Sequence, residues 1–260
     1  MPKDFFSAHN LGSDWLDLSE DPRGGTPTAF FGVSAPHRAL IAAACFTGKT
    51  VYVCDNAQTA ARMAEEIAGY SGAAPALLCA KDEVLLYKDA VSKDALYRRL
   101  NALYEISRGA AIIVADIESL LQLFPKKLPV LSLQEGEETD FSSLSSRLVG
   151  MGYTRTASVE SKGSFALRGD ILDIYPVNFE NPVRVDFFGD TVEKIKPYNF
   201  ITGERLPLIS RAEIAAATDV FFEEGERRRV KEILFDELHD FKNAEAYNRA
   251  ASISGEVAAK

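Results

Sequence analysis

Thr47-Gly48-Lys49-Thr50 has the ending of a P-loop, the glycine-rich turn whose backbone N–H groups hold nucleotide phosphates. A working P-loop follows a strand, precedes a helix and carries a glycine five residues ahead of its second glycine. Here Ala43 occupies that earlier position, a helix is predicted before the motif, and a strand is predicted after it. The sequence therefore predicts that this motif binds no nucleotide and that Gly48 ends a helix.

The strand–turn–helix order of a P-loop is predicted earlier in the chain, around Gly32, after a predicted strand at 28–31. When the pattern GxxxxGK[ST] starts at Gly32, His37 stands at the second glycine and Arg38 at the phosphate-binding lysine. Ala39 stands at the magnesium-binding hydroxyl and has no oxygen for a metal ion. We therefore predict a degenerate loop that binds no nucleotide, although Arg38 could still attract an anion.

Asp236-Glu237-Leu238-His239 has the form of a helicase Asp-Glu-x-His motif, which requires an apolar strand before its aspartate. Apolar residues at 230, 233, 234, 238 and 241 instead follow the spacing of an amphipathic helix. The carboxylates Asp170, Asp173 and Asp186 have no partner base nearby, which favours turn or strand-edge roles for them. The cysteines and histidines show no metal-binding spacing. The sequence predicts neither catalytic residues nor a metal site.

Residues 183–188 (VRVDFF) combine side chains that favour protein binding. The period of two in a strand predicts a core face made of Val183, Val185 and Phe187. The opposite face, made of Arg184, Asp186 and Phe188, joins charge to a large aromatic ring, which suits a protein-binding surface. Phe188 could instead pack under a neighbouring loop, and the pattern does not distinguish these two cases.

Short apolar strands and helices alternate between residues 29 and 124. The predicted strands are 51–54, 76–79 and 110–115, and the predicted helices are 34–46, 55–70, 92–107 and 117–124. Strands separated by helices imply parallel pairing with helices on both faces of the sheet. The sequence therefore predicts an α/β domain over residues 1–124.

A linker-like segment begins at Pro125, and a different pattern follows it. A helix capped by Asp140 is predicted to run to about residue 149, and several short strands follow, including a hairpin at Gly189-Asp190. These elements predict a small inserted α+β domain with antiparallel strands over residues 125–208. Residues 209–260 are predicted to return to the α/β unit through an extended strand at 213–222 and one or two helices beyond 226.

Composition limits the function classes further. The net charge of −9 and the pI near 5.0 argue against a surface that coats nucleic acid, which needs a basic stripe. The three cysteines lie in apolar contexts, which is typical of buried thiols in a reducing compartment. No apolar run has the length of a membrane span, and no signal pattern opens the chain. The sequence predicts a cytoplasmic protein with no membrane contact.

The segments 168–176 (RGDILDIYP) and 182–190 (PVRVDFFGD) together resemble the signature of the UvrB homology module. This module occurs in the nucleotide-excision-repair protein UvrB and at the N-terminus of bacterial transcription-repair coupling factors. The resemblance implies a domain 1A over 1–124, a domain 2 over 125–208, and the start of a domain 1B over 209–260. UvrB keeps an intact P-loop, so the degenerate loop at 32–39 indicates the coupling-factor branch.

The resemblance also implies a partner. In this family domain 2 binds the damage-recognition protein UvrA, and the contact residues align with Arg168, Arg184 and Phe188. The resemblance implies that this chain hydrolyses no ATP and needs no cofactor. ATP and magnesium belong to the translocase motor of the full-length family, and RNA polymerase and DNA are bound by other parts of it.

Two functions from different classes follow. In the first, the chain recruits UvrA to stalled RNA polymerase through domain 2. In the second, it is a fragment of an ATP-dependent enzyme, similar to UvrB or to a helicase, with residual nucleotide or DNA binding in domain 1A. The loop at 32–39 discriminates between them.

Overall fold

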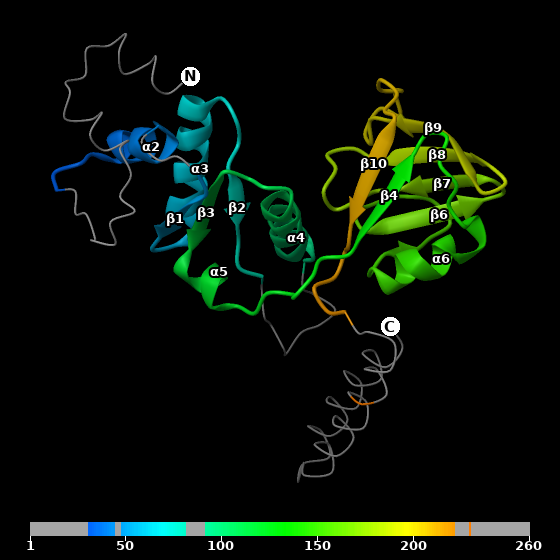
Figure 1. Ribbon diagram of the computed structural model, residues 1–260, viewed down its shortest axis with the longest axis horizontal. Coiled ribbons are helices and arrows are strands. Elements are labelled where there is room, and N and C mark those ends of the chain that lie inside the picture. Colours follow the sequence, from blue (N-terminus) through cyan, green and yellow to red (C-terminus); the bar gives the residue numbers. More distant parts are fainter. Residues whose placement is uncertain (1–30, 45–47, 82–91, 222–228, 230–260) are drawn as a thin grey trace. The chain divides into compact units, whose positions relative to one another are not determined.

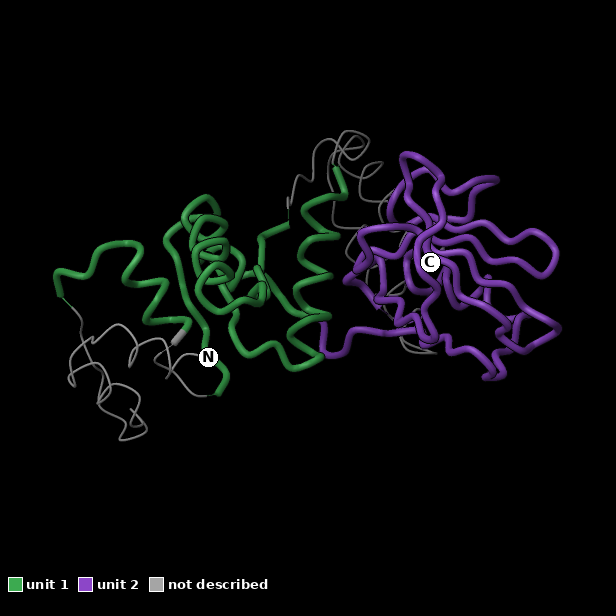
Figure 2. Tube along the Cα trace, turned by 90° about the horizontal axis from the view of Figure 1, so that it is seen from above, with its two compact units in different colours: residues 1–124 green, residues 125–260 purple. Residues whose placement is uncertain are grey.

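A computed structural model describes residues 31–44, 48–81, 92–221 and 229 of the chain (Figure 1). The chain divides into two compact units, residues 1–124 and 125–260 (Figure 2). Most of the predicted strand at 28–31 and the segment with Asp236-Glu237-Leu238-His239 lie outside the described residues. Within the described part of the chain, no helix is both long enough and apolar enough to span a membrane.

The first unit is an α/β unit with a parallel sheet, as predicted. Its strands are β1 (Thr50–Cys54), β2 (Ala76–Leu78) and β3 (Ile112–Asp116). Its helices are α2 (Ala35–Ala44), α3 (Ala57–Ser71), α4 (Asp94–Ser107) and α5 (Ile117–Leu121). The strand order is β1–β3–β2, and both pairings are parallel. Helix α5 is shorter than the predicted helix at 117–124, because the backbone is already extended at Gln122.

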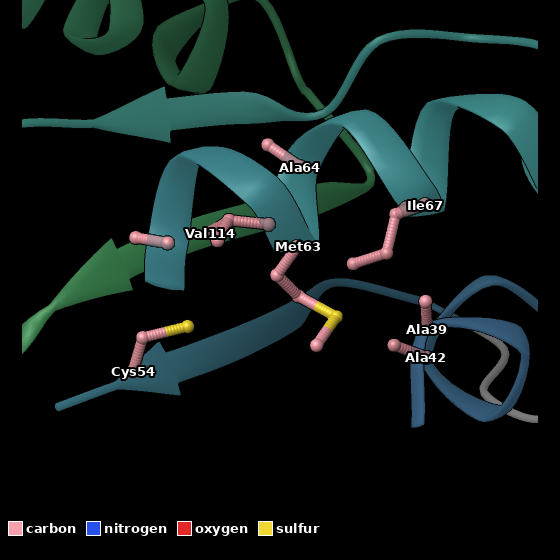
Figure 3. Close-up of a cluster of buried hydrophobic side chains, with 8 residues drawn as sticks. Ala39, Ala42, Cys54, Met63, Ala64, Ile67 and Val114 are labelled. Atoms are coloured by element: carbon pink, nitrogen blue, oxygen red, sulfur yellow. The ribbon is translucent and has the colours of Figure 1, made fainter. Parts of the chain in front are cut away.

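Helices cover both faces of the central strand β3, as the sequence predicts. Val114 lies on one face in a buried cluster with Met63 of α3 and residues of α2 (Figure 3). Ile113 and Ala115 lie on the other face and pack in a second cluster with Ala102 of α4. Successive strand residues point to opposite faces, so an apolar β3 requires a helix on each side.

The second unit is an α+β unit with mainly antiparallel strands, again as predicted. Its main sheet contains β5 (Thr154–Arg155), β6 (Ser164–Arg168), β7 (Ile171–Ile174), β8 (Val183–Phe188) and β9 (Thr191–Pro197), in that order. A separate antiparallel pair joins β4 (Val130–Gln134) to β10 (Arg211–Ala215). Helix α6 (Phe141–Gly150) begins after Asp140, whose carboxylate accepts hydrogen bonds from the N–H groups of Ser142 and Ser143.

The strand β10 lies in the second unit, beyond the boundary that the sequence predicts at residue 208. It pairs with β4 from Arg211 opposite Gln134 to Ala215 opposite Val130. The Tyr153 hydroxyl also donates a 2.6 Å hydrogen bond to the Ala215 carbonyl. Strand 211–215 therefore completes the second unit, because its backbone groups find their partners there and not in the α/β unit.

Helix α6 closes one face of the five-stranded sheet. Its Leu144 and Leu148 are fully buried, and the ring of Phe141 lies 4.9 Å from the ring of Phe187 on β8. The Phe141 N–H donates to the Asp190 carboxylate at 3.0 Å, which ties the start of the helix to the β8–β9 turn. This face is the inner face of the sheet. The side chains that alternate with the inward ones along each strand lie on the outer face.

Gly152 tests the packing of the second unit. Its φ is +87°, and a Cβ at this position would lie 2.7 Å from the Thr218 Cβ and 2.9 Å from the Thr218 backbone nitrogen. We expect Gly152→Ala to lower the free energy of unfolding in two ways. The left-handed backbone costs about 1–2 kcal/mol, and the clash costs about 1–3 kcal/mol more.

Gly136 provides the matched control, because its φ is +83° and a Cβ there would meet nothing within 4 Å. Gly136→Ala should therefore show the backbone cost alone. Urea unfolding followed by circular dichroism measures both variants. Equal losses of stability in the two variants would contradict the close approach of Thr218 to Gly152.

Candidate partner-binding surface

The alternation predicted for residues 183–188 is confirmed in β8. The inner-face side chains Val183, Val185 and Phe187 are at most 4% exposed. Phe188, on the opposite face, is 77% exposed. No described loop covers its ring, so the alternative in which Phe188 packs under a neighbouring loop is wrong.

Strand register places all three predicted binding residues on the outer face of the sheet. Arg168 of β6 pairs with Ile171 of β7, which pairs in turn with Asp186 of β8. Arg184 and Phe188 flank Asp186 in β8 on the same face. One strand separates β6 from β8, so Arg168 is about 10 Å from the β8 backbone.

Arg168 and Phe188 also lie at the same end of the sheet. Each is the last residue of its strand and is followed by a glycine with positive φ, Gly169 at +56° and Gly189 at +59°. These glycines open the tight turns that join β6 to β7 and β8 to β9. The two turns lie at one end of the antiparallel sheet, so Arg168 and Phe188 mark the same edge.

Arg184 is held by a buried carboxylate that lies directly opposite it. Its Nε and Nη2 atoms donate to the two carboxylate oxygens of Asp173 at 2.7 and 2.9 Å. Asp173 is 7% exposed, whereas the side chain of Arg184 is 47% exposed. The hydrogen bonds to Asp173 raise the pKa of the guanidinium, so Arg184 stays charged in any physiological buffer.

Further side chains complete this part of the outer face. Lys196 of β9 lies opposite Arg184 and forms an ion pair with Asp186. The ring centroid of Tyr198 lies 6.0 Å from the guanidinium carbon of Arg184, at the limit of a cation–π contact. The charges of Arg184 with Asp173 and of Lys196 with Asp186 are therefore paired across neighbouring strands, whereas Arg168 donates to the Ala157 carbonyl.

The apolar part of the surface consists of Phe188 and Ile171. Ile171 is 36% exposed and lies opposite Asp186, which makes it a diagonal neighbour of Phe188. Such neighbours are about 7–8 Å apart, within reach of an aromatic ring. A large exposed ring with arginines on the same face has the composition of a protein-binding hot spot.

Sequence reasoning missed Asp173 and Lys196 as members of this surface. The pattern favours turn or strand-edge roles for Asp173 and Asp186, whereas both form ion pairs on the outer face. Asp173 could have been identified only from the register of β7 against β8, which places it opposite Arg184. Register depends on pairing between segments and is not visible in either segment alone.

The loop at 32–39, which the sequence predicts to be a degenerate P-loop, lies in the first unit, before and at the start of α2. Ala39 is fully buried in the core cluster, where Figure 3 shows it beside Ala42. Arg38 donates from Nε to the Val33 carbonyl at 3.0 Å, and Ser34 Oγ lies 2.7 Å from His37 Nδ1. The polar groups of this loop therefore contact one another, and its magnesium position is an apolar core residue.

A cavity of about 480 Å³ adjoins this loop and is lined by Arg38 and by apolar and aromatic side chains such as Phe31 and Tyr52. Gly48 precedes β1, so a strand follows the Thr47–Thr50 motif as predicted. In the described ranges, no group of three or more His, Cys, Asp or Glu side chains is arranged to hold a metal ion.

Comparison with known proteins places this surface in a family context. Residues 131–220, which run from the second residue of β4 to beyond β10, match the UvrB interaction domain. The chain is 31% identical over 196 residues to the transcription-repair-coupling factor of Myxococcus xanthus, covering 70% of this chain and 16% of that protein. It is 27% identical over 210 residues to the transcription-repair-coupling factor of Bacillus subtilis, covering 77% of this chain and 18% of that protein.

A second group of relatives carries a different name. The chain is 33% identical over 153 residues to UvrABC system protein B of Clostridium botulinum, covering 55% of this chain and 23% of that protein. The chain thus spans less than a quarter of the length of these curated relatives. Residues 131–220 therefore match the UvrB interaction domain, in a chain homologous to the transcription-repair-coupling factors and to UvrABC system protein B.

Proposed function

We propose that this chain recruits the damage-recognition protein UvrA to transcription complexes stalled at DNA damage. UvrA binds the outer face of the second unit, and Arg168, Arg184 and Phe188 make the contacts. RNA polymerase and DNA are engaged by other parts of the larger protein to which such a region belongs. The chain acts in the cytoplasm, where excision repair takes place.

The observation that carries this proposal is the exposure of Phe188. The Phe188 ring is 77% exposed at the end of a well-paired strand, so a partner that covers it gains a large apolar contact beside two arginines. Arg168 and Arg184 lie on the same face, and the whole surface falls within the UvrB interaction domain. Homology to both transcription-repair-coupling factors and UvrABC system protein B supports UvrA as the partner.

The proposal includes no ATP hydrolysis and no cofactor for this chain. The loop at 32–39 supports this part, because Ala39 is buried and Arg38 bonds to the loop's own backbone. The first unit then serves as a scaffold. An ATP-dependent or helicase-like activity in this unit is the alternative that a nucleotide titration tests.

The first test is the affinity for purified UvrA. Phe188→Ala and Arg184→Ala should each weaken binding by about 30-fold, because truncating a hot-spot residue costs about 2 kcal/mol. Arg168→Ala should weaken binding as well. Isothermal titration calorimetry or biolayer interferometry measures the dissociation constants.

Val149→Ala is the control, because Val149 is an exposed apolar residue on α6, which packs against the inner face. This variant should bind UvrA as the unchanged chain does. Phe188→Ala should keep its free energy of unfolding within about 0.5 kcal/mol, as expected for an exposed position. Undiminished binding by both Phe188→Ala and Arg184→Ala would overturn the proposed surface.

The second test is a titration with ATP in the presence of magnesium. We expect no binding in the micromolar range, because the magnesium position is Ala39, which has no hydroxyl, and His37 stands where the second glycine is needed. Isothermal titration calorimetry measures it, with a UvrABC system protein B as the comparison. A micromolar dissociation constant that Arg38→Ala abolishes would establish a nucleotide site and favour the alternative function.

A further inference from the structure

We infer that Asp173 is a positioning residue for partner binding: it fixes the guanidinium of Arg184 so that one edge faces the partner as a directional hydrogen-bond donor. The partner then supplies oxygen acceptors aligned with that edge, and a strongly acidic patch is not required. This inference rests on the proposed function, since it concerns the same outer face.

The donor inventory of Arg184 carries the first step. A guanidinium has five N–H donors in one plane. The bonds to Asp173 use the Nε hydrogen and one Nη2 hydrogen, at 2.7 and 2.9 Å. Three donors remain, two on Nη1 and one on Nη2. Among the described residues, no acceptor contacts Nη1, and 47% of the side chain is exposed.

The burial of Asp173 carries the second step. Its side chain is 9% exposed, so its carboxylate cannot itself reach a protein partner. It lies opposite Arg184 in the β7–β8 pairing, and both strands are held by neighbours on each side. The Tyr198 ring, 6.0 Å away, adds a second contact to the guanidinium. The orientation of Arg184 is therefore set before any partner arrives.

Charge carries the third step. Asp173 and Arg184 carry opposite unit charges, so the pair has no net charge. Lys196 and Asp186 form a second such pair next to it. A surface of this kind selects by the geometry of hydrogen bonds and by the fit of Phe188 more than by long-range attraction. Planar oxygen acceptors, either a carboxylate or backbone carbonyls, match the free edge of Arg184.

The test is a double-mutant cycle in UvrA binding. Asp173→Asn keeps the shape of the side chain but loses the second acceptor, and we expect binding to weaken about tenfold. In the Arg184→Ala background the same change should have less than about a twofold effect, because Asp173 acts only through Arg184. Arg184→Lys should bind as weakly as Arg184→Ala, because an ammonium has no planar edge.

Glu213→Gln is the matched control. It changes another half-exposed arginine–carboxylate pair of the second unit, that of Arg211 and Glu213, at 2.6 Å. This variant should bind UvrA as the unchanged chain does. In the unchanged chain, the Nε hydrogen of Arg184 should exchange slowly with water, because it is bonded to Asp173. In Asp173→Asn, the ¹⁵N–¹H signal of this group should show faster exchange. This measurement needs no partner and shows whether Asp173 holds the Arg184 guanidinium in solution.

The outcomes separate the two proposals. A chain that does not bind UvrA overturns the proposed function and this inference with it. A chain that binds UvrA and loses affinity in Arg184→Ala, but not in Asp173→Asn, overturns this inference alone. So does an Asp173→Asn effect of equal size in both backgrounds, since that shows a purely structural role. Salt dependence of the remaining affinity distinguishes the acceptors: a carboxylate contact weakens with added salt, and a carbonyl contact does not.

Discussion

The burial of one face of the five-stranded sheet determines the arrangement of the second unit. Helix α6 seals that face with Phe141, Leu144 and Leu148, and the inward side chains of β8 are almost fully buried. A strand has a period of two, so each inward valine or phenylalanine requires its neighbour to point outward. A shift of register by one residue would bury Arg184 and expose Val185. The hydrophobic core therefore sets both the register and the position of Arg184 and Phe188, the residues proposed to bind a partner.

On the outer face, ion pairs and not apolar packing hold the side chains in place. A buried carboxylate is costly unless it is paired and hydrogen-bonded, and Asp173 meets both conditions through Arg184. The pairing restricts Arg184 to one orientation, which lowers the entropy that binding must remove. Phe188 is an aromatic side chain with only two χ angles, so ordering it on binding costs little entropy. The surface thus combines a donor held by Asp173 with an exposed aromatic ring.

The first unit is an α/β scaffold whose core includes part of the loop at 32–39. Its fold depends on β3 being apolar on both faces, with α2 and α3 on one side and α4 on the other. In the loop, Ala39 contributes to this core instead of offering an oxygen to a metal ion. A small apolar side chain fits this closely packed position.

Local patterns in the sequence were enough to predict several features. They include the parallel α/β unit, the α+β unit after residue 125, the Asp140 cap and the two faces of residues 183–188. These features depend on side-chain period, capping and turn residues within a few positions of one another. The signature around Arg168 and Phe188 also pointed correctly to the UvrB interaction domain.

Only the tertiary structure decided which of these segments meet. It placed β10 beside β4 and brought Arg168 and Phe188 to the same end of one sheet. It also placed Asp173 opposite Arg184 on the neighbouring strand. It also decided that Phe188 is exposed, because exposure depends on what neighbouring loops leave uncovered. The physical reason is the same in each case. Strand pairing satisfies backbone hydrogen bonds between residues far apart in the chain, and no local pattern specifies which partner is chosen.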